Sequence, residues 1–147
     1  MLHKKSTADW RIIGGKRIYF RSLWEANFGK YLQWQLDNGF IKDWLHEPQT
    51  FWFEEIKRGV RSYLPDFKVI TLESGHVWYE VKGYYDSKSL TKIKRFKKYY
   101  PEEKLFLIDA KWFADNNQKC RLIIPSWEIG KSSLPKFKSM SKKSIET

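Results

Sequence analysis

The stretch "SYLPDFKVITLESGHVWYEVKGYYD", Ser62 to Asp86, places two strand-forming runs on either side of a turn signal at Ser74-Gly75. Apolar and β-branched residues alternate with polar ones in both runs, which is typical of half-buried strands. The runs also carry Asp66, Glu80 and Lys82, although burying charge is unfavourable. We therefore predict a β-hairpin with one core face and one face that carries these charged groups.

The length of the turn decides which charged residues meet. A three-residue loop with Gly75 in the left-handed conformation pairs Leu72 with His76 and places Asp66 opposite Lys82, on the same face as Glu80. A two-residue loop would instead put Asp66 and Glu80 on opposite faces. Two interpretations of the shared face are open: a solvated face with a weak Asp–Lys pair, or a functional site. Pro65 and Gly83 favour the site, because proline bends a strand and glycine admits a second backbone or a phosphate.

A helix is predicted on each side of the hairpin in the sequence. Ser22 and Asn38-Gly39 are start and stop signals for a helix over residues 23–37. A second helix is predicted in "SKSLTKIKRFKKYYP", which ends before Pro101. Further strands are predicted in "FIKDWLHEP", "TFWFEEI", "KLFLID" and "KCRLII". The expected fold class is α/β, in one domain over residues 18–125, with a loosely held extension over residues 1–17 and a basic tail over residues 126–147.

The charge balance favours a polyanionic partner. The 147 residues carry 28 Lys and Arg against 17 Asp and Glu, a net charge of +11 with an isoelectric point near 9.7. Nucleic acid is the leading candidate, and solubility alone is the alternative. A basic tail of this kind is either solvated or a phosphate-contacting arm, and its sequence does not choose between them.

Other chemistries find little support. The single cysteine, Cys120, lies in an apolar run and is interpreted as a packed small residue. His3, His46 and His76 are too scattered for a histidine metal pair. No apolar stretch is long enough for a membrane span and no export signal is visible, so we expect a cytoplasmic protein without a membrane partner.

The motif Pro65-Asp66 followed by Glu80-Val81-Lys82 resembles that of the PD-(D/E)XK nuclease superfamily. "YLPDF" and "YEVKGY" are especially similar to small members of it, the phage-type junction-resolving endonucleases and the nuclease subunits of Tn7-like transposases. The resemblance covers residues 21–108 and implies a restriction-endonuclease-like mixed central β-sheet flanked by helices. It also raises the expectation that the protein is phage-encoded and acts in the host cytoplasm.

The resemblance implies a site of four catalytic residues, Glu25, Asp66, Glu80 and Lys82. It implies metal ligands from Glu25, Asp66, Glu80 and the Val81 carbonyl, a set of oxygens that suits Mg²⁺, with Mn²⁺ as a substitute. Glu25 has a second interpretation, because Ser22-Leu-Trp-Glu25 also matches a capping box in which the glutamate bonds the Ser22 amide.

The predicted helix after the hairpin is strongly basic and has no acidic residue from Lys88 to Tyr100. Its like charges repel one another, and phosphate contacts would relieve that repulsion; a solvated outer face is the alternative. Tyr84 and Tyr85 either stack on a substrate or pack beside the site. The predicted DNA-binding residues are Lys88, Lys92, Lys94, Arg95 and Lys98.

These expectations point to a metal-dependent DNA endonuclease directed by DNA structure, such as a Holliday junction or another branch. Paired cuts in a junction favour a homodimer. Two alternatives stay open. One is a nuclease subunit whose partners in a recombination, transposition or repair complex choose the site, and the other is a non-catalytic DNA-binding module of the same fold.

Overall fold

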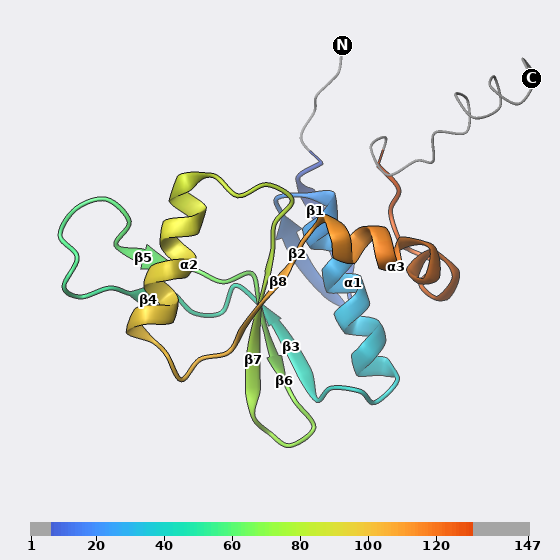
Figure 1. Ribbon diagram of the computed structural model, residues 1–147. Coiled ribbons are helices and arrows are strands. Elements are labelled where there is room, and N and C mark those ends of the chain that lie inside the picture. Colours follow the sequence, from blue (N-terminus) through green and yellow to red (C-terminus); the bar gives the residue numbers. More distant parts are fainter. Residues whose placement is uncertain (1–6, 131–147) are drawn as a thin grey trace, which may run out of the picture.

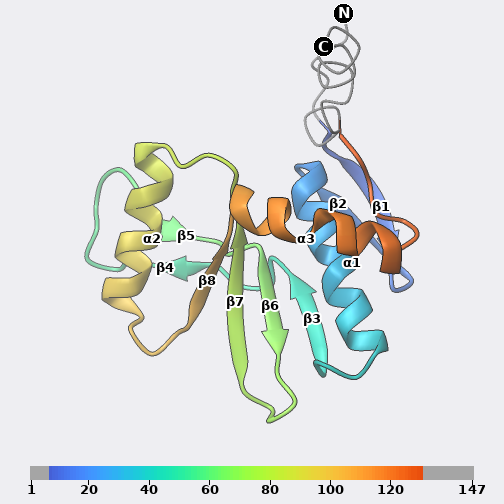
Figure 2. The ribbon, with the colours of Figure 1, turned by 45° about the vertical axis from the view of Figure 1, so that its right-hand side comes forward.

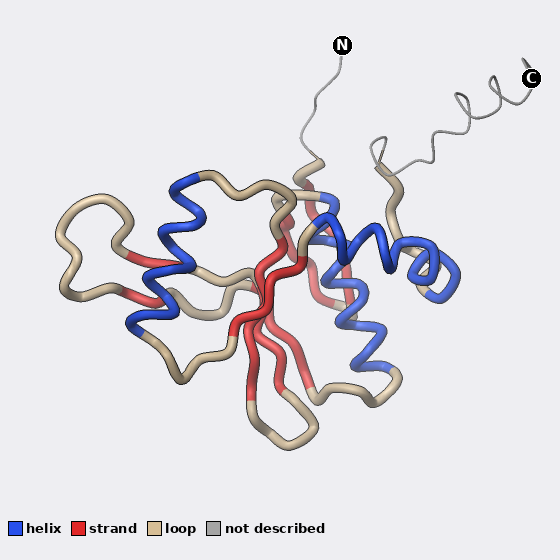
Figure 3. Tube along the Cα trace, in the orientation of Figure 1, coloured by secondary structure: helices blue, strands red, loops and turns tan. Residues whose placement is uncertain are grey.

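The computed structural model describes residues 7–130 as three layers built around a four-stranded sheet (Figure 1). The secondary structure is coloured in Figure 3. In chain order the elements are β1 (Asp9–Ile13), β2 (Lys16–Phe20), α1 (Leu23–Asp37), β3 (Asp43–His46), β4 (Phe51–Trp52), β5 (Ser62–Tyr63), β6 (Phe67–Ile70), β7 (His76–Val81), α2 (Ser87–Tyr99), β8 (Leu105–Ile108) and α3 (Ala110–Ile123).

The central sheet has the order β3-β6-β7-β8. β3, β6 and β7 are antiparallel neighbours, whereas β8 runs parallel to β7. A parallel neighbour cannot be reached through a tight turn, and here α2 forms the crossover between the two strands. The predicted α/β class with a mixed central sheet is therefore confirmed.

Each face of the sheet is covered by a different hydrophobic cluster (Figure 2). On one side Phe67, Val69 and Val81 pack with α1, α3 and the β1–β2 hairpin. On the other side Trp78 packs with Phe96 of α2 and with the short β4–β5 pair. The second face of the β6–β7 hairpin is thus mixed: Trp78 packs in the cluster, Lys68 lies opposite it, and Asp66 and Glu80 lie at one end.

The first two helices begin and end where the sequence signals predict. The Ser22 hydroxyl caps α1 by accepting from the Glu25 amide at 3.1 Å, and Gly39 follows the helix with a positive φ of 76°. Asp86 caps α2 by accepting from the Ser89 amide at 2.7 Å. Both helices follow a local code of caps and apolar spacing, which is why sequence alone could place them.

The prediction of a strand in "KCRLII" is wrong, because these residues belong to α3 and its C-terminal end. Asp109 caps this helix through the Trp112 amide at 3.1 Å. Phe113 and Cys120, seven residues apart, are both buried on its inner face. A short apolar run fits a strand or a buried helical turn equally well, and the helical period becomes visible only when residues 110–118 are included.

The expectation of a loosely held extension over residues 1–17 is wrong for β1 and for the turn that follows it. Ile13 pairs with Lys16 across a two-residue turn in which Gly14 and Gly15 have φ of 60° and 78°. Positive φ at both positions matches the turn type that fits the twist of paired strands. Ile13 and Phe20 are buried against α1, so the Gly-Gly pair marks a hairpin rather than a flexible lead-in.

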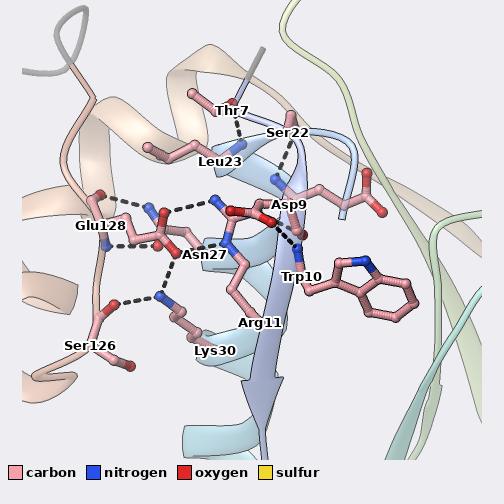
Figure 4. A network of polar contacts seen from close by, with 11 residues as sticks. Thr7, Asp9, Trp10, Arg11, Ser22, Leu23, Asn27, Lys30, Ser126 and Glu128 are labelled. Carbon is pink, nitrogen blue, oxygen red and sulfur yellow. Dashed lines mark hydrogen bonds and ion pairs between the residues drawn. The ribbon is translucent and has the colours of Figure 1, made fainter. Parts of the chain in front are cut away.

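The folded domain also continues past residue 125. Trp127 is buried, and Glu128 accepts from Arg11 and Lys30 in ion pairs of 2.8 Å each (Figure 4). Asn27 completes the network by bonding the Glu128 backbone through both its amide nitrogen and its carbonyl oxygen. The Arg11 and Lys30 side chains lower the pKa of the Glu128 carboxyl to about 2. The predicted tail thus does not begin at 126, and its remaining part, residues 131–147, lies outside the described residues.

The β6–β7 hairpin has a three-residue loop, one position earlier than predicted. The Thr71 amide donates to the Gly75 carbonyl at 2.9 Å, and Ser74 rather than Gly75 is left-handed, with φ of 71°. Phe67 therefore pairs with Tyr79, so the register places Asp66 level with Glu80 and not with Lys82. The shift is two positions in the pairing, an even number, and each residue keeps its predicted face.

The observed register also places Lys68 opposite Trp78, with its ammonium 5.5 Å from the centre of an indole ring. Within residues 7–130, no helix has both the length and the apolar character needed to cross a membrane.

We expect the Cys120 thiol to be inert in the folded protein. It is buried in the main core, and burial raises its pKa. Iodoacetamide should alkylate it at least about a hundredfold more slowly in buffer than in denaturant, since reaction requires opening of the core. Equal rates measured by mass spectrometry would contradict the packing of α3.

Candidate functional site

A cavity of about 510 Å³ lies where the start of α1, the ends of β5 and β7 and the first half of α2 meet. All four predicted catalytic residues, Glu25, Asp66, Glu80 and Lys82, line it. They come from three separate segments of the chain, and only the tertiary fold brings them to one place. Arg21, Tyr63, Val81, Ser89 and Lys92 are further lining residues.

Asp66 is fixed at the centre of this arrangement. Its side chain is buried, and Oδ2 accepts a hydrogen bond from the Val81 amide at 2.8 Å. Its carbonyl accepts from the Glu47 amide, also at 2.8 Å, which ties it to the end of β3. Asp66 follows Pro65 and precedes β6, so it leaves the strand ladder just where its side chain can turn to β7.

Glu80 has a different partner on the same face. Its Oε1 accepts a hydrogen bond from the Tyr63 hydroxyl at 2.7 Å. Tyr63 is itself buried in the second cluster, against Phe96. The ring is therefore held by packing, and its hydroxyl orients one oxygen of the carboxylate.

Glu25 is buried, and its carboxylate contacts Nε2 of His46 rather than the Ser22 amide. Only the hydroxyl half of the predicted capping box is present, in which Ser22 accepts from the Glu25 amide. The alternative role of Glu25 as a cap is thus not supported by its side chain, which lies in the cavity wall. His46 is a contact that the sequence interpretation missed, because it comes from β3, 21 residues away.

The Asp66 and Glu80 carboxyl groups hold their protons more tightly than ordinary carboxyls. Burial raises the pKa of Asp66 well above its usual value, and the nearby Glu80 and Glu25 raise it further, against the Val81 hydrogen bond. Burial also raises the pKa of Glu80, whereas Tyr63 and Lys82 lower it. Three carboxylates that share one partly dry cavity repel one another, and a bound cation would relieve that repulsion.

Two sets of groups could hold a metal ion. Asp66, Glu80 and Glu25 offer oxygens alone, which fits Mg²⁺ or Mn²⁺. In the arrangement seen here, however, the ligand atoms within 4.8 Å of one another belong to Glu25, His46 and Glu47, and the three predicted carboxylates do not form so close a group. Glu25 is common to both sets. Arg21 contacts the Glu47 carboxylate, and His46 contacts the Glu25 carboxylate, so both sets contain a group that already has a partner.

Lys82 lines the cavity beside Glu80 and forms no ion pair within 4.0 Å in the described part of the chain. Its amide donates to the Ile108 carbonyl at 2.9 Å, which fixes the backbone at the end of β7. Gly83 has a packing role: a Cβ there would lie 2.8 Å from the Trp24 ring. The missing side chain of Gly83 thus makes room for an indole of α1, while Gly83 itself lines the cavity, so approach of a phosphate there stays a prediction.

The predicted DNA-binding residues divide by position on α2. Lys92 lines the cavity together with Ser89. The side chains of Lys88, Lys94 and Lys98 are exposed outside it. Arg95 donates to the Val60 carbonyl and so anchors the loop between β4 and β5. This tether gives Arg95 a structural contact in place of the free side chain that we expected.

Tyr85 is a further residue of interest beside the site. Its hydroxyl is buried and has no hydrogen-bond partner within residues 7–130. Burial, followed by the charges of Glu80, Asp109 and Asp66, raises the pKa of this phenol to about 12. A buried donor without a partner next to three carboxylates is an unsatisfied group of the kind that a bound ligand or water completes. The neighbouring Tyr84 is exposed and lines the cavity, and the choice between stacking and packing stays open for both rings.

Comparison of the chain with protein-family models, with curated proteins and with solved structures finds no match.

Replacing Asp66 with asparagine should stabilise the metal-free protein above neutral pH. Asparagine keeps an acceptor for the Val81 amide but removes one of the crowded charges. A raised pKa means that the folded chain holds a proton that the unfolded chain has released, so wild-type stability falls as pH rises through that window. We expect a gain of about 1–2 kcal/mol in the free energy of unfolding at pH 8, vanishing below the ordinary carboxyl range.

Urea titrations from pH 3 to pH 8 measure this difference. Mg²⁺ should then raise the melting temperature of wild type more than that of Asp66→Asn, since only wild type has the full charge to neutralise. An asparagine variant that is less stable than wild type at every pH would show that the Asp66 charge is already compensated in the fold.

Proposed function

We propose that the protein is a metal-dependent DNA endonuclease that hydrolyses phosphodiester bonds. The observation that carries this proposal is the convergence of Glu25, Asp66, Glu80 and Lys82 in one cavity, whose rim adds Lys92 of the basic helix. Acidic groups that could hold a divalent ion thus lie beside cations that could hold a phosphate. The resemblance of the sequence motif to PD-(D/E)XK nucleases supports the same assignment.

Each residue has a distinct task in this proposal. Glu25, Asp66 and Glu80 would hold Mg²⁺ or Mn²⁺, with the Val81 carbonyl as a further oxygen. When bound, such an ion supplies Lewis-acid polarisation of the scissile phosphate and stabilises negative charge on the leaving oxygen. Tyr63 orients the Glu80 carboxylate through its hydroxyl, and the Val81 amide orients Asp66.

Lys82 acts mainly by position and charge. Its positive charge lies near Glu80 and lowers the pKa of that carboxyl. As an ammonium group, Lys82 would donate hydrogen bonds to the attacking water and to a phosphate oxygen. The water oxygen would form a bond to phosphorus as the bond from phosphorus to the leaving oxygen breaks, and a carboxylate of the site would accept the proton that the water loses. The cationic Lys82 and Lys92 would offset the negative charge that accumulates on the phosphate.

DNA structure rather than base sequence is the feature that this protein would recognise. The whole chain carries a net charge of +11, and the exposed lysines on α2 suit contacts to the phosphate backbone. No second domain for base readout fits within the described residues. A branched substrate such as a four-way junction needs two coordinated cuts, which a homodimer would supply.

A second candidate, a nuclease subunit directed by partners in a recombination or transposition complex, is favoured by the edge of the sheet. β8 is an edge strand, and its Phe106 and Leu107 are both exposed. An open strand edge with apolar side chains is a surface that another protein chain can cover. This candidate predicts weak cleavage by the protein alone and strong cleavage once its partners are added.

Cleavage of a labelled four-way junction and of a matched linear duplex tests both candidates. We expect paired nicks in the junction that require Mg²⁺ or Mn²⁺ and are abolished by EDTA. Asp66→Asn and Lys82→Ala should each slow cleavage by about a hundredfold or more while DNA binding persists, because neither change removes the phosphate-contacting helix.

Lys111→Ala is a matched control for Lys82→Ala, since Lys111 is exposed on α3 and lies outside the cavity. Equal cutting of both substrates would replace the junction-specific version by a general nuclease. A purified wild type that binds DNA but never cuts it, with any divalent metal and with candidate partners present, would leave only the non-catalytic module.

We expect junction binding to require two copies of the chain. Light scattering of wild type with and without junction DNA measures the stoichiometry, and the expected mass in the complex contains two protein chains per junction. A complex of one chain per junction would contradict the homodimer, although it would leave the chemistry of the site unchanged.

A further inference from the structure

A second groove lies on the far side of the His46–Glu25 contact from the candidate site. It has a volume of about 520 Å³ and runs between the β1–β2 hairpin and β3. This volume is in the range of pockets that hold a small organic ligand, roughly 300–1,000 Å³. The proposed function does not use this groove. Its lining includes Trp10, Lys16, Arg17, Tyr19 and His46.

Two aromatic side chains of the hairpin line the groove while remaining open to solvent. Trp10 is 49% exposed and Tyr19 is 44% exposed, and their rings meet edge to face at 5.5 Å across the two strands. Figure 4 shows the Trp10 indole on the opposite side of β1 from Arg11 and its ion-paired network. The pair is therefore held by the hairpin but is not used to build the core.

Cations accompany these rings. The Arg17 guanidinium lies 4.1 Å from the centre of a Trp10 ring, and the Lys16 ammonium lies 5.8 Å from that of Trp44. None of the described residues that line the groove is acidic. Neither Lys16 nor Arg17 forms an ion pair within 4.0 Å in the described part of the chain. The groove thus combines aromatic faces with uncompensated positive charge.

The groove and the candidate site share a wall. His46 lines the groove, and its Nε2 contacts the Glu25 carboxylate that lines the site. The groove and the site therefore lie next to each other, on either side of this pair of side chains.

We propose that this groove binds an unpaired DNA strand next to the cleavage site, with a base stacked on Trp10 and Tyr19 and phosphates held by Lys16 and Arg17. The assignment rests on the proposed function, which supplies DNA as the ligand. Aromatic platforms with adjacent cations bind single strands without regard to sequence, whereas bases in a duplex are already stacked on one another. The positive charge favours DNA over an apolar protein segment.

Binding measured by fluorescence anisotropy tests the proposal, in the Asp66→Asn background so that no probe is cut. The probes are a fluorescein-labelled oligothymidylate and a linear duplex. Trp10→Ala and Arg17→Gln should each weaken binding of the single strand by about tenfold, the effect expected for losing one stacked base. Duplex binding should change by less than about twofold. Circular dichroism and thermal melting establish that each variant is folded.

Matched controls come from outside the groove. Trp52 on β4 is 55% exposed and lines neither cavity, so Trp52→Ala removes a similar indole. Arg121 is exposed on α3 and serves as the control for charge through Arg121→Gln. Both control variants should bind the single strand as tightly as the parent. Equal losses in variants and controls, or no loss in Trp10→Ala, would overturn the assignment.

Two further outcomes distinguish this proposal from the proposed nuclease function and from a contact between two copies of the chain. If wild type never cleaves DNA but Trp10→Ala and Arg17→Gln lose single-strand binding, the groove stands and the proposed nuclease function fails. If light scattering shows that Trp10→Ala abolishes a protein dimer while single-strand binding is unchanged, the aromatic face is a contact between copies of the chain, and the groove proposal is wrong.

Discussion

The hydrogen bond from the Val81 amide to the Asp66 carboxylate is the contact on which the candidate site depends. It joins the residue before β6 to the last residue of β7, at the point where the two strands separate. Because Asp66 and Glu80 are level in the hairpin and on the same face, this bond holds the Asp66 carboxylate in the same cavity as Glu80. Lys82 lies two residues after Glu80, and its amide donates a hydrogen bond to the Ile108 carbonyl, which fixes the backbone there.

The surrounding fold holds several carboxylates in one cavity, although their negative charges repel one another. Burial and mutual repulsion raise the pKa of Asp66 and Glu80, yet packing leaves these side chains little freedom to move apart. Tyr63, held against Phe96, lines the cavity and contacts Glu80. His46, held beside Phe20 and Phe67, contacts Glu25. Crowded carboxylates in rigid surroundings support the proposal that this site binds a cation.

The two faces of the sheet serve the site differently. The α1 side supplies Glu25 and fixes it through the main core, which the Glu128 network closes at the C-terminal end of the described chain. The α2 side supplies Lys92 and a basic outer surface over Phe96 and Trp78. The negative centre of the cavity is therefore flanked by positive charge, which is the combination required to hold both a metal ion and a phosphate.

The sequence by itself determined the features that depend on neighbouring residues: the bounds of α1 and α2, the existence of the β6–β7 hairpin, and the face shared by Asp66 and Glu80. Caps, helical spacing and the two-residue period of strands are local signals, and an even error in register leaves the faces unchanged. The tertiary structure alone decided that "KCRLII" is helical, that β1 and Trp127 belong to the core, and that Gly83 receives Trp24. It also decided that Glu25 contacts His46 and that Tyr63 contacts Glu80. Each of these depends on segments far apart in the chain, whose contacts are set by packing of the whole domain and by no local pattern.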